Sequence, residues 1–529
     1  MRDSDRQSEF PAAQYPLRGR RGDKPRSPQA SWWARTCAAL VLCAAAATAS
    51  PAQTFTTLHN FHGSDGNAPL AGLIQGTDGN LYGTTYSGGA NTNSDWCKSD
   101  DSTCGTVFKI TPAGRFTTIY NFCSQTDCTD GSLPEAGLIQ AGDGNFYGTT
   151  TNGGAHEGGT IFRITPSGAL TTLYSFCSES NCTDGLQPKA GLIQATDGKL
   201  YGTTEQGGVD DCSLVSLGCG TVFAITLTGA LTTVYSFCPQ YGCYDGSAPE
   251  AGLLQGTDGN FYGTTAAGGG YGHNGSGSGT VFKLTSGGML TTLYSFCSRE
   301  NCADGSGPNG LVQAASGNFY GTTSEGGDDK GCFDGCGIVF KITSTGVLNM
   351  LHKFQGSSNG ANSGAYPYAG LVVGTDGSFW GTTGYGGEWD DGVAFKITPN
   401  GTLNFYSIDP TYGDGPVAPL VQDTNGNFYG TNSHGGAGGD GTVFALSLGL
   451  RPFVETQPTS APVGKPINIL GTSLSGSTSV TFNGTPATFS VKSPSLITTT
   501  VPAGATTGTV QVVTPGGTLS SNVPFRVIE

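Results

Sequence analysis

Residues 136–176 read AGLIQAGDGNFYGTTTNGGAHEGGTIFRITPSGALTTLYSF, and this stretch decides the fold. It contains four short runs rich in β-branched and aromatic residues, at 136–140, 145–150, 159–165 and 170–176. Runs of this kind, bounded by Gly, Pro, Asn, Asp and Ser, are typical of β-strands. Asp143-Gly144 predicts a type I′ hairpin between the first two runs, and Pro166-Ser167-Gly168 predicts a tight turn between the last two. The stretch therefore predicts a four-stranded meander.

The same unit recurs seven times along the chain. Its clearest marker is Leu81-Tyr-Gly-Thr-Thr85, which returns in closely similar form at 146–150, 200–204, 261–265, 319–323, 379–383 and 428–432. Internal self-similarity marks a repeat architecture, and meanders repeated around an axis form a β-propeller. We therefore predict an all-β chain in which residues 53–450 form a seven-bladed β-propeller of four-stranded blades.

The repeat is circularly shifted. A fourth-strand run at 55–61 precedes the first complete unit, whereas the last unit ends at its third run, 441–446. Pairing of 55–61 with 441–446 would complete the seventh blade and protect both strand edges. We expect the N-terminal strand to close the propeller in this way.

The repeat resembles the tandem GloVer (Gloeo_Verruco) repeat of bacterial exported proteins. The resemblance covers about residues 55–446 and rests on Gly-Leu-Ile-Gln, Asp-Gly-Asn, Tyr-Gly-Thr-Thr and Gly-Thr-Val-Phe-Lys-Ile-Thr elements that occur in this order. It implies export and a repeat architecture, and it implies no known activity.

Residues 451–529 have a different composition, with no Cys and many Thr, Ser, Val and Pro. Strand-like runs separated by Gly, Pro and Asn turns predict a small β-sandwich. The run Val480-Thr-Phe-Asn-Gly484, followed by 487–489 and 500–504, resembles an IPT/TIG domain, which implies an immunoglobulin-like fold and a role as a spacer or interaction module.

Residues 1–52 have the features of an export signal: a basic stretch, an apolar run at 37–47 and small residues at 47–52. No stretch is long and apolar enough to predict a transmembrane segment in the mature chain. Removal of 1–52 takes away eight of 24 Lys and Arg and four of 39 Asp and Glu, which leaves 16 against 35 and a net charge of −19. Such a surface repels nucleic acid. We expect a monomer that is secreted, periplasmic or on the cell surface.

The 14 cysteines outside the leader fall into seven local pairs. Even-numbered, paired cysteines in an exported chain predict disulfides, and zinc is the competing interpretation. All pairs lie in the inter-blade loops or in the connections between second and third strands, which share one face of a propeller. This face, called the loop face below, is where binding is expected. The pairs are Cys97/Cys104, Cys123/Cys128, Cys177/Cys182, Cys212/Cys219, Cys238/Cys243, Cys297/Cys302 and Cys332/Cys336.

An aspartate followed by Gly recurs in six of the inter-blade loops, which makes it a candidate ligand set. Six carboxylates near the channel could bind a cation, and calcium is the candidate cofactor. The alternative is an Asx turn, in which each carboxylate accepts from its own loop. The residues are Asp65, Asp130, Asp184, Asp245, Asp304 and Asp414.

Motifs for catalysis are absent from the sequence: it has no serine elbow, no phosphate loop and no metal-binding His spacing. Glu205 with Asp210 and Asp211, or Asp328 with Asp329, could supply paired carboxylates for a hydrolase or lyase acting on polysaccharide. We expect a non-catalytic exported binding or surface-display protein whose loop face contacts a glycan, a peptide or a cell-envelope protein. The alternatives are the polysaccharide enzyme and a purely structural envelope component.

Overall fold

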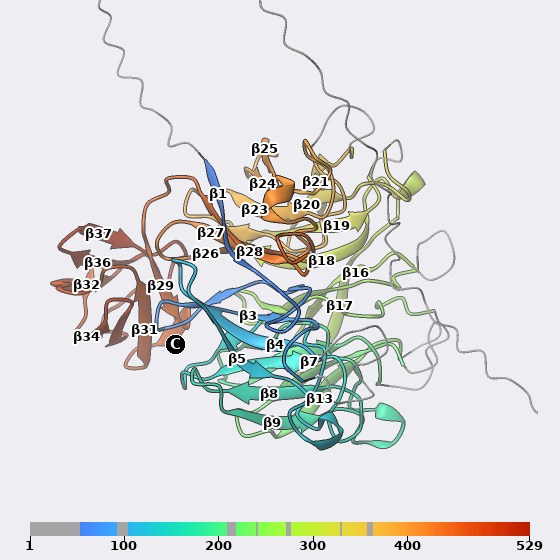
Figure 1. Cartoon of the computed structure of the whole chain (residues 1–529), viewed down its shortest axis with the longest axis horizontal. Helices are drawn as coiled ribbons and strands as arrows, with labels where there is room; N and C mark the ends of the chain where they lie inside the picture. Colours follow the sequence, from blue (N-terminus) through green and yellow to red (C-terminus); the bar gives the residue numbers. More distant parts are fainter. Residues whose placement is uncertain are drawn as a thin grey trace, which may run out of the picture. The chain divides into compact units, whose positions relative to one another are not determined.

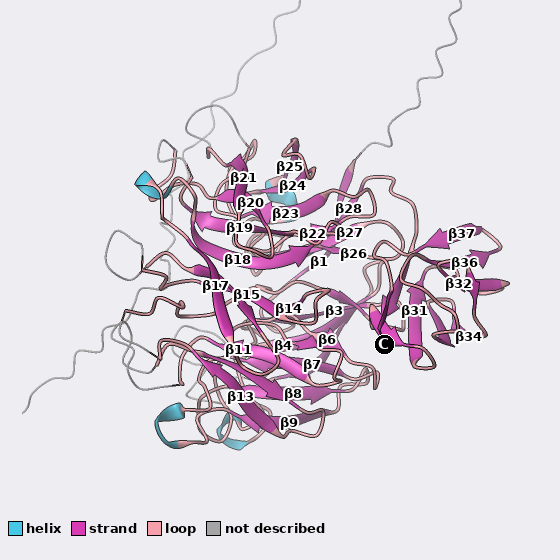
Figure 2. Ribbon diagram, turned by 180° about the vertical axis from the view of Figure 1, so that it is seen from behind, coloured by secondary structure: helices cyan, strands magenta, loops and turns pink. Residues whose placement is uncertain are grey.

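The structure is a computed structural model that describes residues 53–91, 104–208, 218–239, 242–270, 277–327, 331–356 and 363–528. The expected export signal at 1–52 lies outside these residues. Strands and loops make up nearly all of the described chain (Figure 2). The helical segments among the described residues are the short 3-10 turns η2 (Thr126–Cys128), η3 (Ser180–Cys182), η4 (Glu300–Cys302) and η5 (Pro410–Tyr412).

Seven four-stranded antiparallel sheets form blades 1 to 7, and Figure 1 traces their strands in chain order. Blades 1 to 3 are β2 (Ile74–Gln75), β3 (Leu81–Thr85), β4 (Thr106–Ile110) and β5 (Phe116–Asn121); β6 (Ile139–Gln140), β7 (Phe146–Thr150), β8 (Thr160–Ile164) and β9 (Leu170–Ser175); and β10 (Ile193–Gln194), β11 (Leu200–Thr204), β12 (Thr221–Ile225) and β13 (Leu231–Ser236). Blades 4 and 5 are β14 (Leu254–Gln255), β15 (Phe261–Thr265), β16 (Thr280–Leu284) and β17 (Leu290–Ser295); and β18 (Ser306–Gln313), β19 (Phe319–Glu325), β20 (Ile338–Ile342) and β21 (Leu348–Lys353). Blade 6 is β22 (Val372–Val373), β23 (Phe379–Thr383), β24 (Val393–Ile397) and β25 (Leu403–Ser407).

Blade 7 is assembled from both ends of the repeat region. Its strands are β26 (Val421–Gln422), β27 (Phe428–Asn432), β28 (Thr442–Ser447) and the N-terminal β1 (Thr54–Asn60). β1 pairs antiparallel with β28, with Thr54 opposite Ser447 and Asn60 opposite Thr442. The predicted pairing of the first strand with the last repeat is therefore confirmed.

One hydrogen bond links each blade to the next. The first Thr of each Tyr-Gly-Thr or Trp-Gly-Thr motif donates its hydroxyl to a backbone carbonyl at the start of the next blade, for example Thr84 to Ala136 at 2.9 Å. The same bond runs from blade 7 to blade 1, between Thr431 and Ala71 at 3.2 Å. Gln75 adds two bonds to Thr424 across that same junction. Blade 7 thus contacts blade 1 as every other blade contacts its successor, which is the relation the propeller fold requires. The remaining bonds of the series are Thr149 to Ala190, Thr203 to Pro249, Thr264 to Asn309, Thr322 to Ala369 and Thr382 to Ala418.

The core between blades consists of stacked aromatic rings. Tyr82 of blade 1 lies 4.0 Å, centroid to centroid, from Phe146 of blade 2, and both side chains are fully buried. Gly83 makes room for the ring of Phe108 on the adjacent strand of blade 1, since a Cβ there would lie 2.6 Å from that ring, and Phe108 in turn contacts Phe61 of blade 7. The repeated motif therefore serves packing between blades, as repeat proteins require.

The hairpin between first and second strands differs from the prediction. Only Gly144 has positive φ, at 83°, and Asp143 does not. Ala141 accepts from the Gly144 amide and donates to the Asn145 carbonyl. The turn is therefore the longer type I form that ends in a left-handed Gly, not a type I′ turn.

The C-terminal region forms the predicted sandwich, with one sheet ordered β29-β31-β35-β34 and another ordered β33-β32-β36-β37. Ile469, Ile497, Val480 and Val512 are buried between them. The strands are β29 (Val454–Gln457), β30 (Ser460–Pro462), β31 (Pro466–Gly471), β32 (Ser479–Phe482), β33 (Thr485–Pro486), β34 (Phe489–Ser493), β35 (Leu496–Thr500), β36 (Val510–Thr514), β37 (Gly517–Ser520) and β38 (Arg526–Ile528). Across the described ranges, no helix has the length and apolar character needed to cross a membrane.

Candidate functional site

The segments that lead into the first strands approach one another closely around the propeller axis. A Cβ added at Gly137 would lie 2.9 Å from the Gly72 carbonyl oxygen of the preceding blade, and one added at Gly370 would lie 3.2 Å from the Cα of Gly310. At these two contacts a side chain would force the neighbouring backbone to move. The segments that precede the first strands of neighbouring blades therefore lie close together.

Two positions per blade lie in or next to these segments. The first follows the Pro of the inter-blade loop, and the second follows the Tyr-Gly-Thr-Thr motif. The two chain segments are hydrogen bonded within a blade, as between the Glu205 amide and the Gln187 carbonyl at 3.0 Å. Unlike the Tyr-Gly-Thr-Thr motif, these positions change from blade to blade. In blades 1 to 7 the first position holds Leu70, Glu135, Lys189, Glu250, Asn309, Tyr368 and Val417, and the second holds Tyr86, Thr151, Glu205, Ala266, Ser324, Gly384 and Ser433.

Four of these residues form a charged arc, which we define as Glu135, Lys189, Glu205 and Glu250 from blades 2, 3 and 4. The Lys189 ammonium lies 3.0 Å from a Glu205 carboxylate oxygen and 3.7 Å from one of Glu250. Lys189 and Glu205 have side chains 28% and 15% exposed. Lys189 therefore pairs with carboxylates from two blades. A third carboxylate, Glu135, lies close enough to contribute to the raised pKa of Lys189.

The arc shifts the protonation of its own members. Burial raises the pKa of Glu250 to about 7. The positive charge of Lys189 opposes this rise, whereas the charge of Glu205 and a hydrogen bond with Glu205 add to it. Burial also raises the pKa of Glu135. Burial disfavours the charged form of Lys189, but the three carboxylates outweigh it and raise its pKa. Although 46% of the Glu250 side chain is reachable by water, protein atoms crowd it at the channel entrance. At neutral pH the arc therefore holds a charged lysine and, in Glu250, a carboxyl that exchanges protons.

Such an arrangement can accept and donate hydrogen bonds from fixed positions. Carboxylates accept from hydroxyl or amine groups, Lys189 donates, and Glu250 can do either near neutral pH. Two neighbouring carboxyl groups, one of them with a pKa raised to about 7, are also the pairing that general acid and base catalysis uses. The geometry therefore suits a polar ligand, with or without chemistry on it.

Sequence reasoning identified only Glu205 of this arc. Its suggested partners Asp210 and Asp211, like Asp328 and Asp329, lie outside the described residues. Glu135, Lys189 and Glu250 were missed, although a signal for them existed: they follow the Pro of the inter-blade loop, at a position that varies between blades.

The six predicted aspartates lie in their inter-blade loops and mostly bind their own loop. Asp130 accepts from the Tyr120 hydroxyl at 2.7 Å and the Ser124 amide at 2.9 Å. Asp184 and Asp304 repeat this pattern, Asp245 accepts from Tyr235 and Cys238, and Asp65 accepts from His62 and contacts His59.

These contacts lie within each aspartate's own loop and preceding strand, but they are not Asx turns, because the donors precede the aspartate instead of following it by two residues. Asp414 differs, since its buried Oδ1 has no hydrogen-bond partner among the described residues. Together with burial, its charge helps to raise the pKa of nearby Asp391 to about 6. Calcium binding by the six aspartates stays a prediction.

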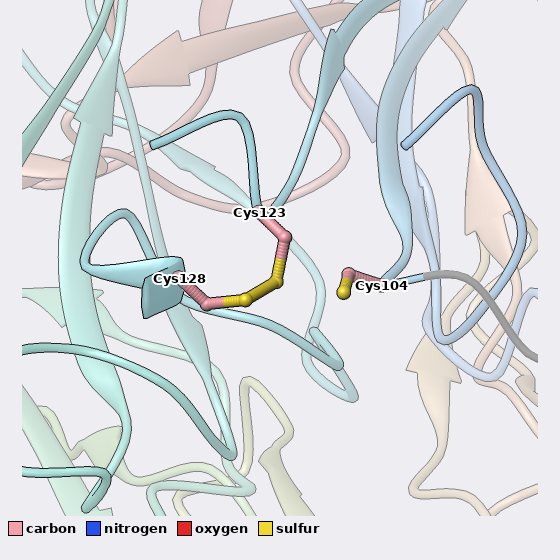
Figure 3. A group of neighbouring side chains, drawn as sticks. All are labelled: Cys104, Cys123 and Cys128. Carbon is pink, nitrogen blue, oxygen red and sulfur yellow. A yellow bond between two sulfur atoms is a disulfide. The ribbon is translucent and has the colours of Figure 1, made fainter. Parts of the chain in front are cut away.

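Disulfides join five of the predicted cysteine pairs: Cys123–Cys128, Cys177–Cys182, Cys238–Cys243, Cys297–Cys302 and Cys332–Cys336. Cys97 and Cys212 lie outside the described residues, so the pairs with Cys104 and Cys219 are not described. Figure 3 shows Cys104 beside the Cys123–Cys128 disulfide. Cys123 and Cys128 both have positive φ, a strained backbone for non-glycine residues. The crosslinks therefore hold strained loops on the loop face.

Comparisons with solved structures give distant similarities. A fungal alcohol oxidase of the AA5 family, in complex with copper, has 14% identity and a TM-score of 0.49, with 90% of this chain and 99% of that one covered. A luciferin-regenerating enzyme has 14% identity and a TM-score of 0.36, with coverage of 58% and 89%. A Bacteroides thetaiotaomicron protein of unknown function has 14% identity and a TM-score of 0.36, with coverage of 65% and 82%.

No curated protein matches the chain. Two family models match the chain. The Gloeobacter/Verrucomicrobia repeat matches residues 46–215, 96–333 and 329–465, and the IPT/TIG domain matches residues 454–527. The repeat matches span the whole propeller, in agreement with the motifs that recur in its seven blades. The chain therefore belongs to the Gloeobacter/Verrucomicrobia repeat family and carries a C-terminal IPT/TIG domain.

Proposed function

We propose that this protein is an exported, non-catalytic binding protein whose loop face holds a glycan, a peptide or a cell-envelope partner. The observation that carries the proposal is the charged arc. Four charged side chains from three consecutive blades gather there, and three of them occupy the position at which blades 1 and 7 have Leu70 and Val417. A rigid scaffold that displays varied side chains on one face is the usual design of a binding surface.

Two further observations support export and display. The five described disulfides need an oxidising compartment to form and persist. The immunoglobulin-like domain that follows the propeller suits a spacer between the binding face and a surface.

Binding is tested with the mature chain, residues 53–529, on a glycan array and in pull-down from envelope extracts. Glu250→Gln keeps the size of the side chain and removes its ability to ionise, so it should weaken a specific signal. Asp197→Asn is the matched control, because Asp197 is an exposed hairpin carboxylate 3.9 Å from Lys199. A signal that both variants leave unchanged would place binding elsewhere.

A polysaccharide-cleaving enzyme is the second candidate. The observation that favours it is the proximity of Glu205 to Glu250, whose raised pKa near 7 suits a general acid. Release of reducing ends from labelled polysaccharides, abolished by Glu250→Gln and retained by Asp197→Asn, would establish catalysis and overturn the non-catalytic proposal. Unchanged polysaccharide with a retained binding signal would support binding.

A further inference from the structure

Three tyrosines of blade 6 form a second group of varied side chains on the loop face. We call Tyr366, Tyr368 and Tyr385 the tyrosine cluster. The rings of Tyr366 and Tyr368 are nearly parallel, with 10° between their planes and 6.1 Å between centroids. Tyr385 meets Tyr366 edge to face, at 5.9 Å and 80°. Tyr368 is 37% exposed, so a large flat ring stands at the blade 6 position equivalent to Lys189 of the charged arc.

Local sequence holds these rings in place. Tyr368 lies over Gly384, where an added Cβ would come within 2.9 Å of the ring. Every other blade has a side chain at the position of Gly384. The Tyr366 hydroxyl donates to the Phe333 carbonyl of blade 5 at 3.1 Å. The space above Gly384 accommodates the ring of Tyr368, and the hydrogen bond to Phe333 fixes the ring of Tyr366. The cluster is therefore preorganised for a ligand.

Two carboxylates lie beside the cluster. Burial and the nearby charges of Glu325 and Asp334 raise the pKa of Tyr366, and burial together with Asp334 raises the pKa of Glu325. Neither carboxylate takes part in an ion pair within the described part of the chain. A negative charge there repels phosphate, sulfate and uronate groups, but it accepts hydrogen bonds from hydroxyls.

We propose that the tyrosine cluster is a stacking platform for a neutral pyranose ring of a glycan, with Glu325 and Asp334 accepting bonds from its hydroxyls. One face of a pyranose presents C–H groups, which pack on an aromatic ring, while hydroxyls project from its edge. Parallel tyrosine rings with acceptors at their side match both requirements. A proline-rich peptide would also stack on tyrosines, but it would have no use for the two carboxylates. The inference rests on the proposed binding function and names its ligand class.

Titration calorimetry of residues 53–529 tests the inference. The probes are neutral hexasaccharides of glucose, xylose, mannose and N-acetylglucosamine, and a proline-rich peptide of similar length. Tyr368→Ala should weaken binding of a hexasaccharide by about tenfold, since an aromatic contact contributes about 1.4 kcal/mol. Gly384→Ala retains every ring of the cluster but displaces Tyr368, so it should weaken binding by a smaller factor.

Phe405→Ala is the matched control, because Phe405 is 41% exposed on β25, the fourth strand of the same blade. Weaker hexasaccharide binding in both cluster variants and unchanged binding in the control would support the inference. If a hexasaccharide binds equally well to Tyr368→Ala, or if only the peptide binds, the stacking platform is refuted and the binding function stands. If neither probe binds but envelope extracts yield a partner, the glycan inference also fails. If nothing binds in any assay, the proposed function itself fails.

Discussion

Lys189→Met should destabilise the propeller in a way that depends on pH. Lys189 lies 3.0 Å from Glu205 and 3.7 Å from Glu250. At an effective dielectric constant of 20, these distances correspond to about 5.5 and about 4.5 kcal/mol of raw attraction. The cost of desolvation offsets much of this, and the 46% exposure of Glu250 screens its share. A net loss of about 2 to 3 kcal/mol is therefore expected at pH 8.

The sign of the pH dependence follows from Glu250. Its folded pKa of about 7 lies above the ordinary glutamate value of 4.5, so the folded state binds more protons between these values. The stability contributed by protonated Glu250 is complete below about pH 4.5 and is lost as the pH rises through 7. Without Lys189 the pKa values of Glu250 and Glu135 rise further. The deficit of the variant should therefore be small at pH 5 and largest at pH 8.

Thermal unfolding at pH 5 and pH 8, followed by circular dichroism, measures this deficit. Unfolding entropy scales as about 2.1 cal/mol/K per residue, so about 400 propeller residues give about 1 °C per kcal/mol. Lys189→Met should lower Tm by about 2 to 4 °C at pH 8. The control is Lys199→Met, which breaks an exposed 3.9 Å pair with Asp197 and should shift Tm by less than about 1 °C. Equal shifts in both variants, or a deficit as large at pH 5 as at pH 8, would refute the reasoning.

Three further predictions concern the fold. Deletion of residues 53–60 removes β1 and leaves β28 as an unpaired edge. Size-exclusion chromatography should then show aggregation, and calorimetry should show a lower Tm. A monomer with unchanged Tm would contradict the closure of blade 7 by β1. Asp130→Ala removes the carboxylate that accepts hydrogen bonds from Tyr120 and Ser124, and it should lower the free energy of unfolding in denaturant by about 1 to 3 kcal/mol. Calcium or a chelator should leave the Tm of the unaltered protein unchanged. A rise in Tm with calcium would favour the cation site instead. Cys332→Ser combined with Cys336→Ser should destabilise the chain by about 2 kcal/mol. Intact-mass analysis should confirm the loss of one disulfide. Equal stability would mean that this crosslink closes a loop that is already ordered.

The strand pattern of the propeller could be predicted because it depends on local signals. Alternating apolar residues and turn residues recur in each unit, and the orphan run at 55–61 led directly to the β1 and β28 pairing. First strands are shorter than the sequence suggested, since Ala136 and Gly137 lie outside β6, and a Cβ at Gly137 would meet the Gly72 carbonyl oxygen of the neighbouring blade. Contacts between blades are long-range, and strand propensity does not reveal them.

The charged arc could not be read from any single repeat. Glu135, Lys189 and Glu250 are unremarkable exposed-type residues in their own units, and they become a cluster only because the blades are arranged around an axis. The aspartates are more conspicuous because they recur, yet their recurrence reflects hydrogen bonds that anchor each loop to the tyrosine of its preceding strand. In a repeat protein, the positions that vary are therefore the better guide to a binding site.

The pairing of β1 with β28 also determines how the protein responds to mechanical load. Thr54 is opposite Ser447, so the chain enters β1 and leaves β28 at the same end of this antiparallel ladder. Tension applied between the segment before Thr54 and the immunoglobulin-like domain would peel the two strands apart one hydrogen bond at a time, rather than shear all of them together. The seventh blade would therefore open at low force while the other six blades keep their own four strands.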